Sequence, residues 1–320
     1  MKRFAKLMTI LLSCLSLLPV NAFAKELVAV GQVVGLELQD GTVTVAAFDE
    51  KQSAAQAAGL AVGDRILSIN GKTIRSAQDV RAALNASQGM VTVCIRREST
   101  TVTCKILPEI TADGPKLGLY LRQGVTGVGT VTWYDPETGT FGTLGHGVND
   151  SSGQLLQMVQ GNAYRTSVTA VRRGKSGEPG QLMGCAESPK PIGTLKKNTD
   201  QGVFGTSNIE WDGQAMETAD WDEIRTGAAT IRSTVSGNTV QEYSVEILKI
   251  YPQSSQSGRN LLIKITDPAL LSATGGIVQG MSGSPIIQDG RLIGAVTHVL
   301  VNDPQTGYGI FIENMLQAAG

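Results

Sequence analysis

Two glycine-rich turns carry the residues best suited to chemistry in this chain. Ser282 lies in the run GMSGSP at positions 280–285, between two apolar segments. Glycine beside the serine allows the backbone to bend sharply, so that the hydroxyl projects into a cleft. The same bend can direct the backbone N–H groups of Gly280 and Ser282 to one point, as an oxyanion hole requires. The turn therefore predicts a nucleophilic serine.

A serine hydroxyl needs a base to become nucleophilic at neutral pH. The chain has 2 histidines, and His146 lies in an equally glycine-rich turn, LGHG at positions 144–147. The histidine precedes the serine, as it does where the base comes from a first barrel and the nucleophile from a second. His298, on an apolar segment after the serine, is more typical of a core or pocket-wall histidine. Ser284 is an alternative nucleophile, but no Gly-x pair precedes it to form an anion hole.

Composition indicates a mainly β protein of about two domains. The 320 residues are 41% hydrophobic and 17% charged, which is enough to bury substantial cores. The formal net charge of −1 gives no sign of a nucleic-acid partner or of a polybasic membrane surface. The 38 glycines and the abundant Val, Thr and Ile suit a turn-rich β protein better than a helical one.

The first 24 residues have the features of an export signal. A basic start, MKRFAK, precedes an apolar stretch at positions 7–20, and AFA at 22–24 matches a small-x-small cleavage site. We expect residues 1–24 to be either a cleaved signal peptide or a retained N-terminal membrane anchor helix. In both cases the rest of the chain, from Lys25 onward, is expected outside the cytoplasm, secreted or anchored.

Residues 25–110 are expected to form one small domain. A strand at 65–69 ends in an Asn-Gly turn, and a helix follows Ser76 with Val80 and Leu84 on its apolar stripe. The run GLAVGDRILSING at 59–71 resembles the PDZ domains of bacterial proteases, and GLEL at 35–38 is similar to their carboxylate-binding loop. The resemblance implies a groove that takes an extended peptide or a protein terminus as an added strand. Its expected lining is Gly35, Leu36, Leu38, Val80 and Leu84.

Cysteine usage gives no metal-site spacing. Cys94 and Cys104 lie on two alternating segments that would face each other across a hairpin, so they could form a disulfide or remain two thiols. Neither these residues nor Cys185 has ligand-like partners among the histidines. We therefore expect no cofactor and no metal.

Short strands and glycine turns recur from residue 117 to the end of the chain. A polar linker, TADGP at 111–115, precedes them, and the strongest helix pattern in this part is the short C-terminal one at 313–319. Many short strands over this length predict a closed or paired β-barrel architecture for residues 111–320.

Four motifs, two of which include the turns of His146 and Ser282, give the chain a specific resemblance. The runs GVGTVTWYDP at 127–136, GTLGHG at 142–147, GMSGSP at 280–285 and THV at 297–299 resemble the stage IV sporulation protein B peptidases. That family joins an export or anchor segment, a PDZ domain and a chymotrypsin-like double β-barrel serine protease domain. The resemblance covers essentially the whole chain. It implies a protease in the space between mother cell and forespore that cleaves itself and a membrane-bound regulator, triggering late sigma-factor processing.

The resemblance also assigns roles to single residues. Ser282 would be the nucleophile and His146 the general base, with the N–H groups of Gly280 and Ser282 as the oxyanion hole. The family pattern points to Asp267, which follows a strand at 261–265, as the residue that orients the imidazole. Asp200 is the main alternative, and another carboxylate or none stays open.

Two non-enzymatic functions compete with this interpretation. The chain could be a secreted PDZ scaffold with an inactive protease domain. It could also be a secreted β-barrel binding protein in which the serine-glycine turn is coincidental. Self-cleavage that depends on Ser282 would distinguish the protease from both, and self-association of the chain is one way in which it could occur.

Overall fold

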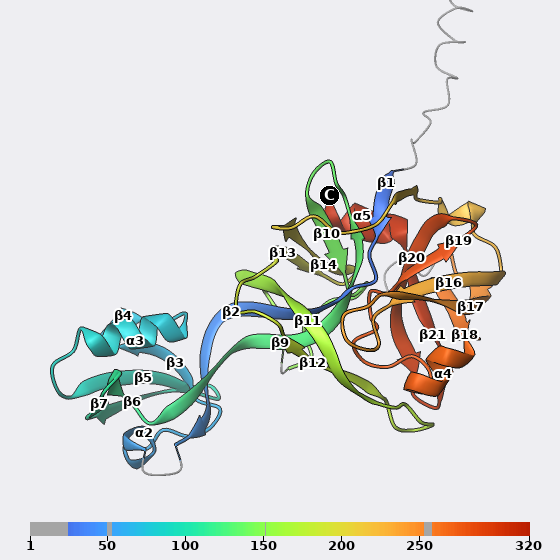
Figure 1. The fold of residues 1–320 in the computed structure, drawn as a ribbon. Helices are drawn as coiled ribbons and strands as arrows, with labels where there is room; N and C mark the ends of the chain where they lie inside the picture. The colour runs from blue at the N-terminus through green and yellow to red at the C-terminus, as the bar shows by residue number, and fades with distance from the viewer. Residues whose placement is uncertain (1–24, 50–52, 151, 253–257) are drawn as a thin grey trace, which may run out of the picture.

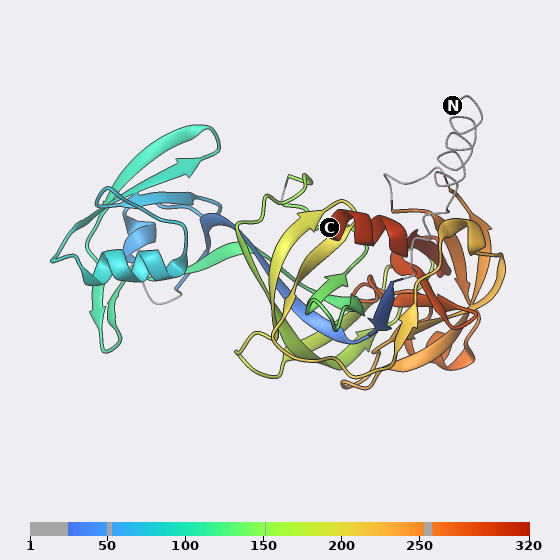
Figure 2. The same ribbon diagram turned by 90° about the horizontal axis from the view of Figure 1, so that it is seen from above.

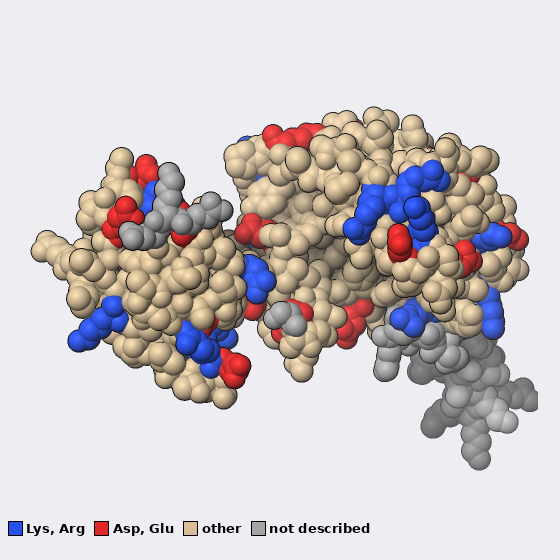
Figure 3. Space-filling model, turned by 90° about the horizontal axis from the view of Figure 1, so that it is seen from below, with Lys and Arg blue, Asp and Glu red and all other residues tan. Residues whose placement is uncertain are grey.

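The computed structural model describes residues 25–49, 53–150, 152–252 and 258–320. The expected signal peptide or anchor at 1–24 lies outside these residues. Within the described ranges, no helix has both the length and the apolar character needed to span a membrane. The chain forms an N-terminal module joined to a larger body, and a constriction separates the two in the space-filling view (Figures 1 and 3).

The first half of the body is a closed ring of antiparallel strands. Each strand pairs with the next in the order β2, β9, β10, β14, β13, β11, and β11 returns to β2. Its core includes Val131, Phe141, Leu195 and Val203. The short β1 (Glu26–Ala29) and β15 (Ala215–Glu217) extend the sheet beside β9, and β12 (Gln181–Ala186) extends β11. The ring strands are β2 (Val33–Phe48), β9 (Leu119–Tyr134), β10 (Thr140–Thr143), β11 (Gln160–Arg172), β13 (Gly193–Thr199) and β14 (Gly202–Ser207).

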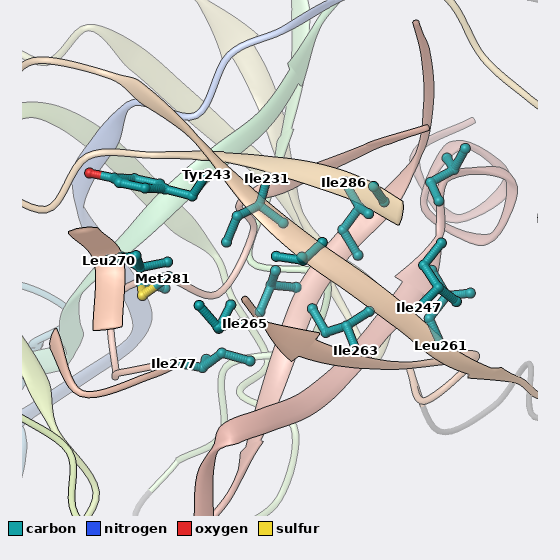
Figure 4. Packing of buried hydrophobic residues seen from close by; sticks show 14 of the residues in the cluster. Ile231, Tyr243, Ile247, Leu261, Ile263, Ile265, Leu270, Ile277, Met281 and Ile286 are labelled. Atoms are coloured by element: carbon teal, nitrogen blue, oxygen red, sulfur yellow. The ribbon is translucent and has the colours of Figure 1, made fainter. Parts of the chain in front are cut away.

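The second half of the body is also a closed barrel, so the expected double-barrel architecture is present. Alternating isoleucine, leucine and valine side chains fill it, as Figure 4 shows for Ile231, Ile247 and Ile263. The 3₁₀ helix η1 (Trp221–Glu223) precedes it, and the helices α4 (Pro268–Thr274) and α5 (Ile312–Ala319) accompany it. Its strands are β16 (Gly227–Ser233), β17 (Gln241–Ile250), β18 (Leu261–Ile265), β19 (Pro285–Gln288), β20 (Arg291–Leu300) and β21 (Asp303–Phe311).

The N-terminal module has a core of its own, which includes Val80 and Leu84 of α3. As expected, the Ser76 side chain caps this helix by accepting a hydrogen bond from the Asp79 amide. The elements of the module are α2 (Ala54–Ala57), β3 (Arg65–Ile69), β4 (Lys72–Thr73), α3 (Ala77–Asn85), β5 (Val91–Arg97), β6 (Thr100–Ile106), β7 (Glu109–Thr111) and β8 (Gly114–Lys116).

Two long strands, β2 and β9, connect the module to the first barrel (Figures 1 and 2). Their barrel ends pair Leu36 with Gly127, and their module ends pair Val45 with Leu121. Between these stretches residues 39–42 bulge out opposite Gly124, whose φ of 58° suits glycine. The module is thus an insertion between two strands of the first barrel.

This insertion corrects the expected domain boundaries. Residues 25–38 were assigned to the PDZ domain, but β1 pairs with β9 and β15, and the first half of β2 pairs with β9 and β11. Leu36 and Leu38 are 4% and 1% exposed in the core of the first barrel. The double-barrel body therefore begins before the module and resumes after it.

The cysteine pair does not form a disulfide. Cys104 lies opposite Val93, and Cys94 lies opposite Thr103. Because successive residues of a strand point to opposite faces, the two sulfurs are on different sides of the sheet. The hairpin itself was predicted, but its register excludes the bridge.

An ion pair between the buried Asp64 and the partly exposed Arg97 holds the loop before β3. The Asp64 carboxylate is 1% exposed and accepts hydrogen bonds from Arg97 Nε and Nη2, both at 2.7 Å, and from the Ala61 amide. The Arg97 hydrogen bonds and then the Ala61 amide lower the pKa of Asp64, although burial opposes them. The ionised pair therefore stabilises the folded state above the unfolded pKa, and this contribution is lost as pH falls through the lowered folded pKa.

We expect Arg97→Met to destabilise the module more than Asp64→Asn. Arg97→Met leaves the buried Asp64 carboxylate without its cation, whereas the Arg97 side chain, 42% exposed, can turn to water when Asp64 is neutralised. Thermal unfolding at pH 7 and pH 4 measures both variants, and the Arg97→Met deficit should shrink at the lower pH. Equal losses at both pH values would contradict this account.

Candidate active site

The predicted nucleophile turn is clamped between the two barrels. Gly280 and Gly283 have φ of 100° and 95°, in the region that favours glycine. Thr130 of β9 donates from its amide to the Ser282 carbonyl at 2.9 Å and from Oγ1 to the Gly280 carbonyl at 2.8 Å. Met281 is fully buried and points into the core of the second barrel (Figure 4). The turn therefore has little freedom to move.

The backbone amides of this turn divide into two groups. Gly283 N donates to the Val296 carbonyl at 2.7 Å, and Ser284 N donates to the Met281 carbonyl at 2.9 Å. Within the residues that the structure describes, the amides of Gly280 and Ser282 donate no hydrogen bond. Both predicted oxyanion donors are thus available to a ligand, and they belong to a turn held rigid by its neighbours.

His146 lies on the turn that follows β10. Leu144 and Gly145 both have φ of 70°, which reverses the chain toward the second barrel. A Cβ on Gly145 would lie 2.9 Å from side-chain atoms of Ile310 and Thr297, so glycine permits this close approach. The two left-handed residues carry the imidazole from the first barrel to the boundary between the barrels.

The imidazole is half-buried and held by a neighbouring carbonyl. His146 Nδ1 lies 2.9 Å from the Gly147 carbonyl oxygen, so Nδ1 carries the proton and Nε2 is left as the acceptor. Burial lowers the pKa of His146 below its ordinary value of 6.5, and the hydrogen bond to Gly147 opposes this only in part. At neutral pH the imidazole is therefore uncharged, as a general base must be.

His146 and Ser282 line one cavity of about 220 Å³. The sequence-predicted convergence of the two turns is therefore present in the structure. In this conformation Ser282 Oγ donates to the Thr297 carbonyl at 2.9 Å, on β20. Rotation about the Cα–Cβ bond would release the hydroxyl from Thr297 toward the cavity that it shares with the imidazole. Catalytic hydrogen bonds often tighten in this way only when substrate binds.

The second histidine lies beside the first. The ring centroids of His146 and His298 are 5.2 Å apart, and the planes are tilted by 40°. Nδ1 of His298 is buried without a hydrogen-bond partner among the described residues. Burial, then the charges of His146 and Arg259, lowers the pKa of His298 to about 4. His298 is thus a neutral neighbour of the proposed base at physiological pH.

Asp267 does not contact His146 in this structure. It is the N-cap of α4, and its Oδ1 accepts hydrogen bonds from the amides of Ala269 and Leu270 at 2.9 and 3.0 Å. Its Oδ2 accepts from Ser244, on β17. The expectation that Asp267 orients the imidazole is therefore corrected: the Gly147 carbonyl holds Nδ1, and the aspartate satisfies the start of a helix.

Neither Asp200, the alternative orienting carboxylate, nor Ser284, the alternative nucleophile, fits its proposed role in the structure. Asp200 lies exposed in the turn between β13 and β14. Ser284 is fully buried, and its Oγ donates to Ser233 Oγ at 3.0 Å, so its hydroxyl does not face the cavity.

The residues expected to line the PDZ groove separate into two groups. Gly35, Leu36 and Leu38 belong to β2 in the first barrel, where Leu36 and Leu38 line the cavity of Ser282. Val80 and Leu84 lie in the core of the module. The expected groove of all five residues is therefore wrong. The sequence did not predict that Thr130 holds the nucleophile turn or that the Gly147 carbonyl holds His146 Nδ1. No local sequence pattern marks either role.

Comparison with known families shows to which protein family the chain belongs. Residues 113–316 match the model of the SpoIVB peptidase S55 family, which is well over half of the chain. This chain belongs to the SpoIVB peptidase S55 family. Residues 50–97 match the PDZ domain model, which identifies the inserted module. The chain is thus a member of this family with a PDZ domain set into its first barrel.

More distant likenesses were found in known sequences and structures. A Rhizobium meliloti (strain 1021) protein named as a zinc metalloprotease is 35% identical over 111 residues, which are 34% of this chain and 29% of that relative. The inactive form of the Rv3671c protease of M. tuberculosis is 13% identical with a TM-score of 0.35, covering 61% of this chain and 82% of that one. The PDZ domain of an SdrC-like protein from Listeria monocytogenes covers 25% of this chain, at 22% identity and a TM-score of 0.22. The matched region spans 85% of the Listeria monocytogenes PDZ chain. Among the described residues of this S55 family member, no group of three metal-binding side chains occurs.

Proposed function

We propose that this S55 family member is a serine endopeptidase with Ser282 as nucleophile and His146 as general base. The observation that carries the proposal is the shared cavity, which brings both side chains together beside the Gly280 and Ser282 amides, which donate no hydrogen bond to any described residue. An uncharged imidazole, a serine on a rigid turn and two directed N–H groups are the parts that acyl transfer needs.

The proposed reaction uses these parts in sequence. His146 Nε2 takes the proton of Ser282 Oγ as the oxygen attacks the carbonyl carbon of the scissile peptide, and the Gly280 and Ser282 amides bind the oxyanion. The imidazolium then gives the proton to the leaving amine as the C–N bond breaks. A water molecule repeats the steps on the acyl-enzyme and regenerates the serine. Throughout, the Gly147 carbonyl holds the proton on Nδ1.

The biological setting is proposed from the family and the N-terminal sequence. The chain would be exported across the cytoplasmic membrane into the space between mother cell and forespore, secreted or anchored by residues 1–24. There it would cleave itself and a membrane-bound regulator, so that processing of a late sigma factor begins. The family match and the export signal support this proposal. A non-catalytic PDZ scaffold is the alternative.

The PDZ module is proposed to dock a peptide or protein terminus. The module end of β9, near Leu119 and Leu121, pairs only with β2 among the described strands. An extended peptide could add to this free edge, as PDZ ligands do. A second copy of the chain presenting its N-terminal segment would fit self-cleavage.

Self-cleavage tests the proposed function. The full-length wild-type chain should shorten at its N-terminus, at bonds before Lys25, because from β1 onward the backbone is hydrogen-bonded into the sheet. Ser282→Ala should stay full length while unfolding at the wild-type temperature. Ser284→Ala, which changes a neighbouring serine outside the cavity, should still be processed. Equal processing of the Ser282→Ala chain in a purified sample would overturn the proposal.

The pH profile should reflect the lowered pKa of His146. Neutral imidazole is the active base, so activity is lost only as pH falls through the lowered folded pKa. The acid limb of kcat/KM for a peptide substrate should therefore have its midpoint below pH 6.5. His298, with a pKa of about 4, adds no positive charge above that range. A midpoint above 6.5 would contradict the burial of the base.

Substitution of Asp267 distinguishes a helix cap from a catalytic carboxylate. Asp267→Asn keeps a good N-cap, so we expect kcat/KM within about threefold of wild type and little change in stability. Asp267→Ala removes the cap and should cost about 1 kcal/mol in urea unfolding. Were Asp267 the orienting acid, the asparagine variant would lose about 10⁴-fold in kcat. Such a loss without unfolding would refute the cap-only role.

A further inference from the structure

The cavity beside Ser282 has an apolar wall that the proposed chemistry does not use. Its interior side chains include Leu36, Val125, Val128, Leu144 and Val148, all from the first barrel. Leu36 and Leu144 are 4% and 5% exposed, so they form a fixed surface rather than a mobile flap. The exposed Gln279 is at the mouth. None of these side chains carries a charge.

The position of the cavity indicates which part of a substrate enters it. The general base gives its proton to the leaving amine, so the leaving group lies on the side of His146. The cavity is bounded by His146, the nucleophile turn and the first barrel, and no residue of β20 lines it. The Thr297 carbonyl of β20 contacts Ser282 Oγ from outside this set. The cavity therefore faces the chain that follows the scissile bond.

We propose that this cavity binds an apolar side chain of the substrate residue immediately after the scissile bond. The inference rests on the proposed serine endopeptidase function and adds a substrate class to it. A volume of about 220 Å³ suits one leucine or phenylalanine side chain. A carboxylate would lose its hydration there and find no cation, because burial keeps His146 uncharged.

Gly127 offers a way to close the cavity without disturbing the fold. It is exposed, lines the cavity, and is the register partner of Leu36, so a side chain there would project to the same face as Leu36. A Cβ at Gly127 would meet no atom within 4 Å, and its φ is outside the positive region. Gly127→Leu should therefore fold normally and occupy the space that the substrate side chain needs.

The test is a series of peptides that differ only in the residue after the cleaved bond. With purified full-length protein, kcat/KM for Leu and Phe should exceed that for Ala by about tenfold or more, and that for Asp by about 100-fold. In Gly127→Leu the Leu-to-Ala ratio should fall to about one or below. Val159→Leu adds apolar bulk at a residue that is 71% exposed and outside the cavity, and it should keep the wild-type ratio.

The outcomes separate this inference from the proposed function. Hydrolysis of a small acyl ester that depends on Ser282, together with peptide cleavage that ignores the residue after the bond, would overturn the inference and leave the endopeptidase standing. A wild-type Leu-to-Ala ratio in Gly127→Leu would also overturn it. Absence of ester hydrolysis and of all peptide cleavage would refute the endopeptidase itself.

Discussion

Replacing His146 by alanine is expected to lower kcat/KM for peptide hydrolysis by roughly 10⁴- to 10⁶-fold. Without the imidazole, none of the other described residues that line the cavity has a side chain that can take the proton from Ser282 Oγ, and the neutral hydroxyl is a poor nucleophile. Ser282→Ala should cost about the same. Because base and nucleophile act as one unit, the double variant should be no slower than either single variant. Steady-state kinetics with one peptide substrate measures all three.

Two controls make this result specific. Each variant should unfold within a few degrees of wild type, since neither side chain is part of a barrel core. Asp200→Asn, at the exposed turn between β13 and β14, should stay within about threefold of wild type. Additive losses in the double variant would mean that the two side chains do not act in one step.

Gly283→Val is expected to be strongly damaging although it changes neither catalytic side chain. A Cβ at Gly283 would overlap the Thr130 carbonyl oxygen and lie 2.6 Å from the Leu144 amide nitrogen. Those atoms are backbone and cannot swing away, and a φ of 95° is unfavourable for valine. We expect a loss of at least about 3 kcal/mol in unfolding free energy, together with displacement of the nucleophile turn.

Gly290→Val is the matched control for this effect. Gly290 also has a positive φ, 76°, but a Cβ there would meet no atom within 4 Å. Its cost should be only the conformational strain, about 1–2 kcal/mol, with the active site intact. Urea unfolding and kcat/KM compare the two variants, and the difference reports the contact between the barrels at Gly283. Similar losses of stability and activity in both variants would show that the close packing at Gly283 contributes neither to the unfolding free energy nor to catalysis.

The site could be predicted from the sequence where local pattern and chain order were informative. The glycines around Ser282 and His146 are needed for sharp turns, which a local sequence pattern reveals. The order of the two residues along the chain also matches a two-barrel arrangement. Which strands surround them could not be predicted, because the pairing of Leu36 with Ala163 and Gly127 joins distant segments. Strand alternation at 35–38 fits either a PDZ loop edge or a barrel wall, and only the long-range pairing decides between them.

The placement of Asp267 shows a different kind of error. The sequence Asp-Pro-Ala has a favourable N-cap residue followed by proline at the first helical position, which is a helix-start signal. The family pattern instead points to a catalytic carboxylate at this position. The structure satisfies the local signal, with the carboxylate bonded to two helix amides. Local capping chemistry was the better guide at this residue.

Reaction with a fluorophosphonate, followed by peptide mapping, tests the central claim most directly. The phosphonyl group should attach to Ser282 Oγ alone in the wild-type chain, and labelling should be nearly abolished in a folded His146→Ala variant. Modification of another serine, or undiminished labelling of Ser282 without the imidazole, would contradict a hydroxyl activated by His146 across the shared cavity.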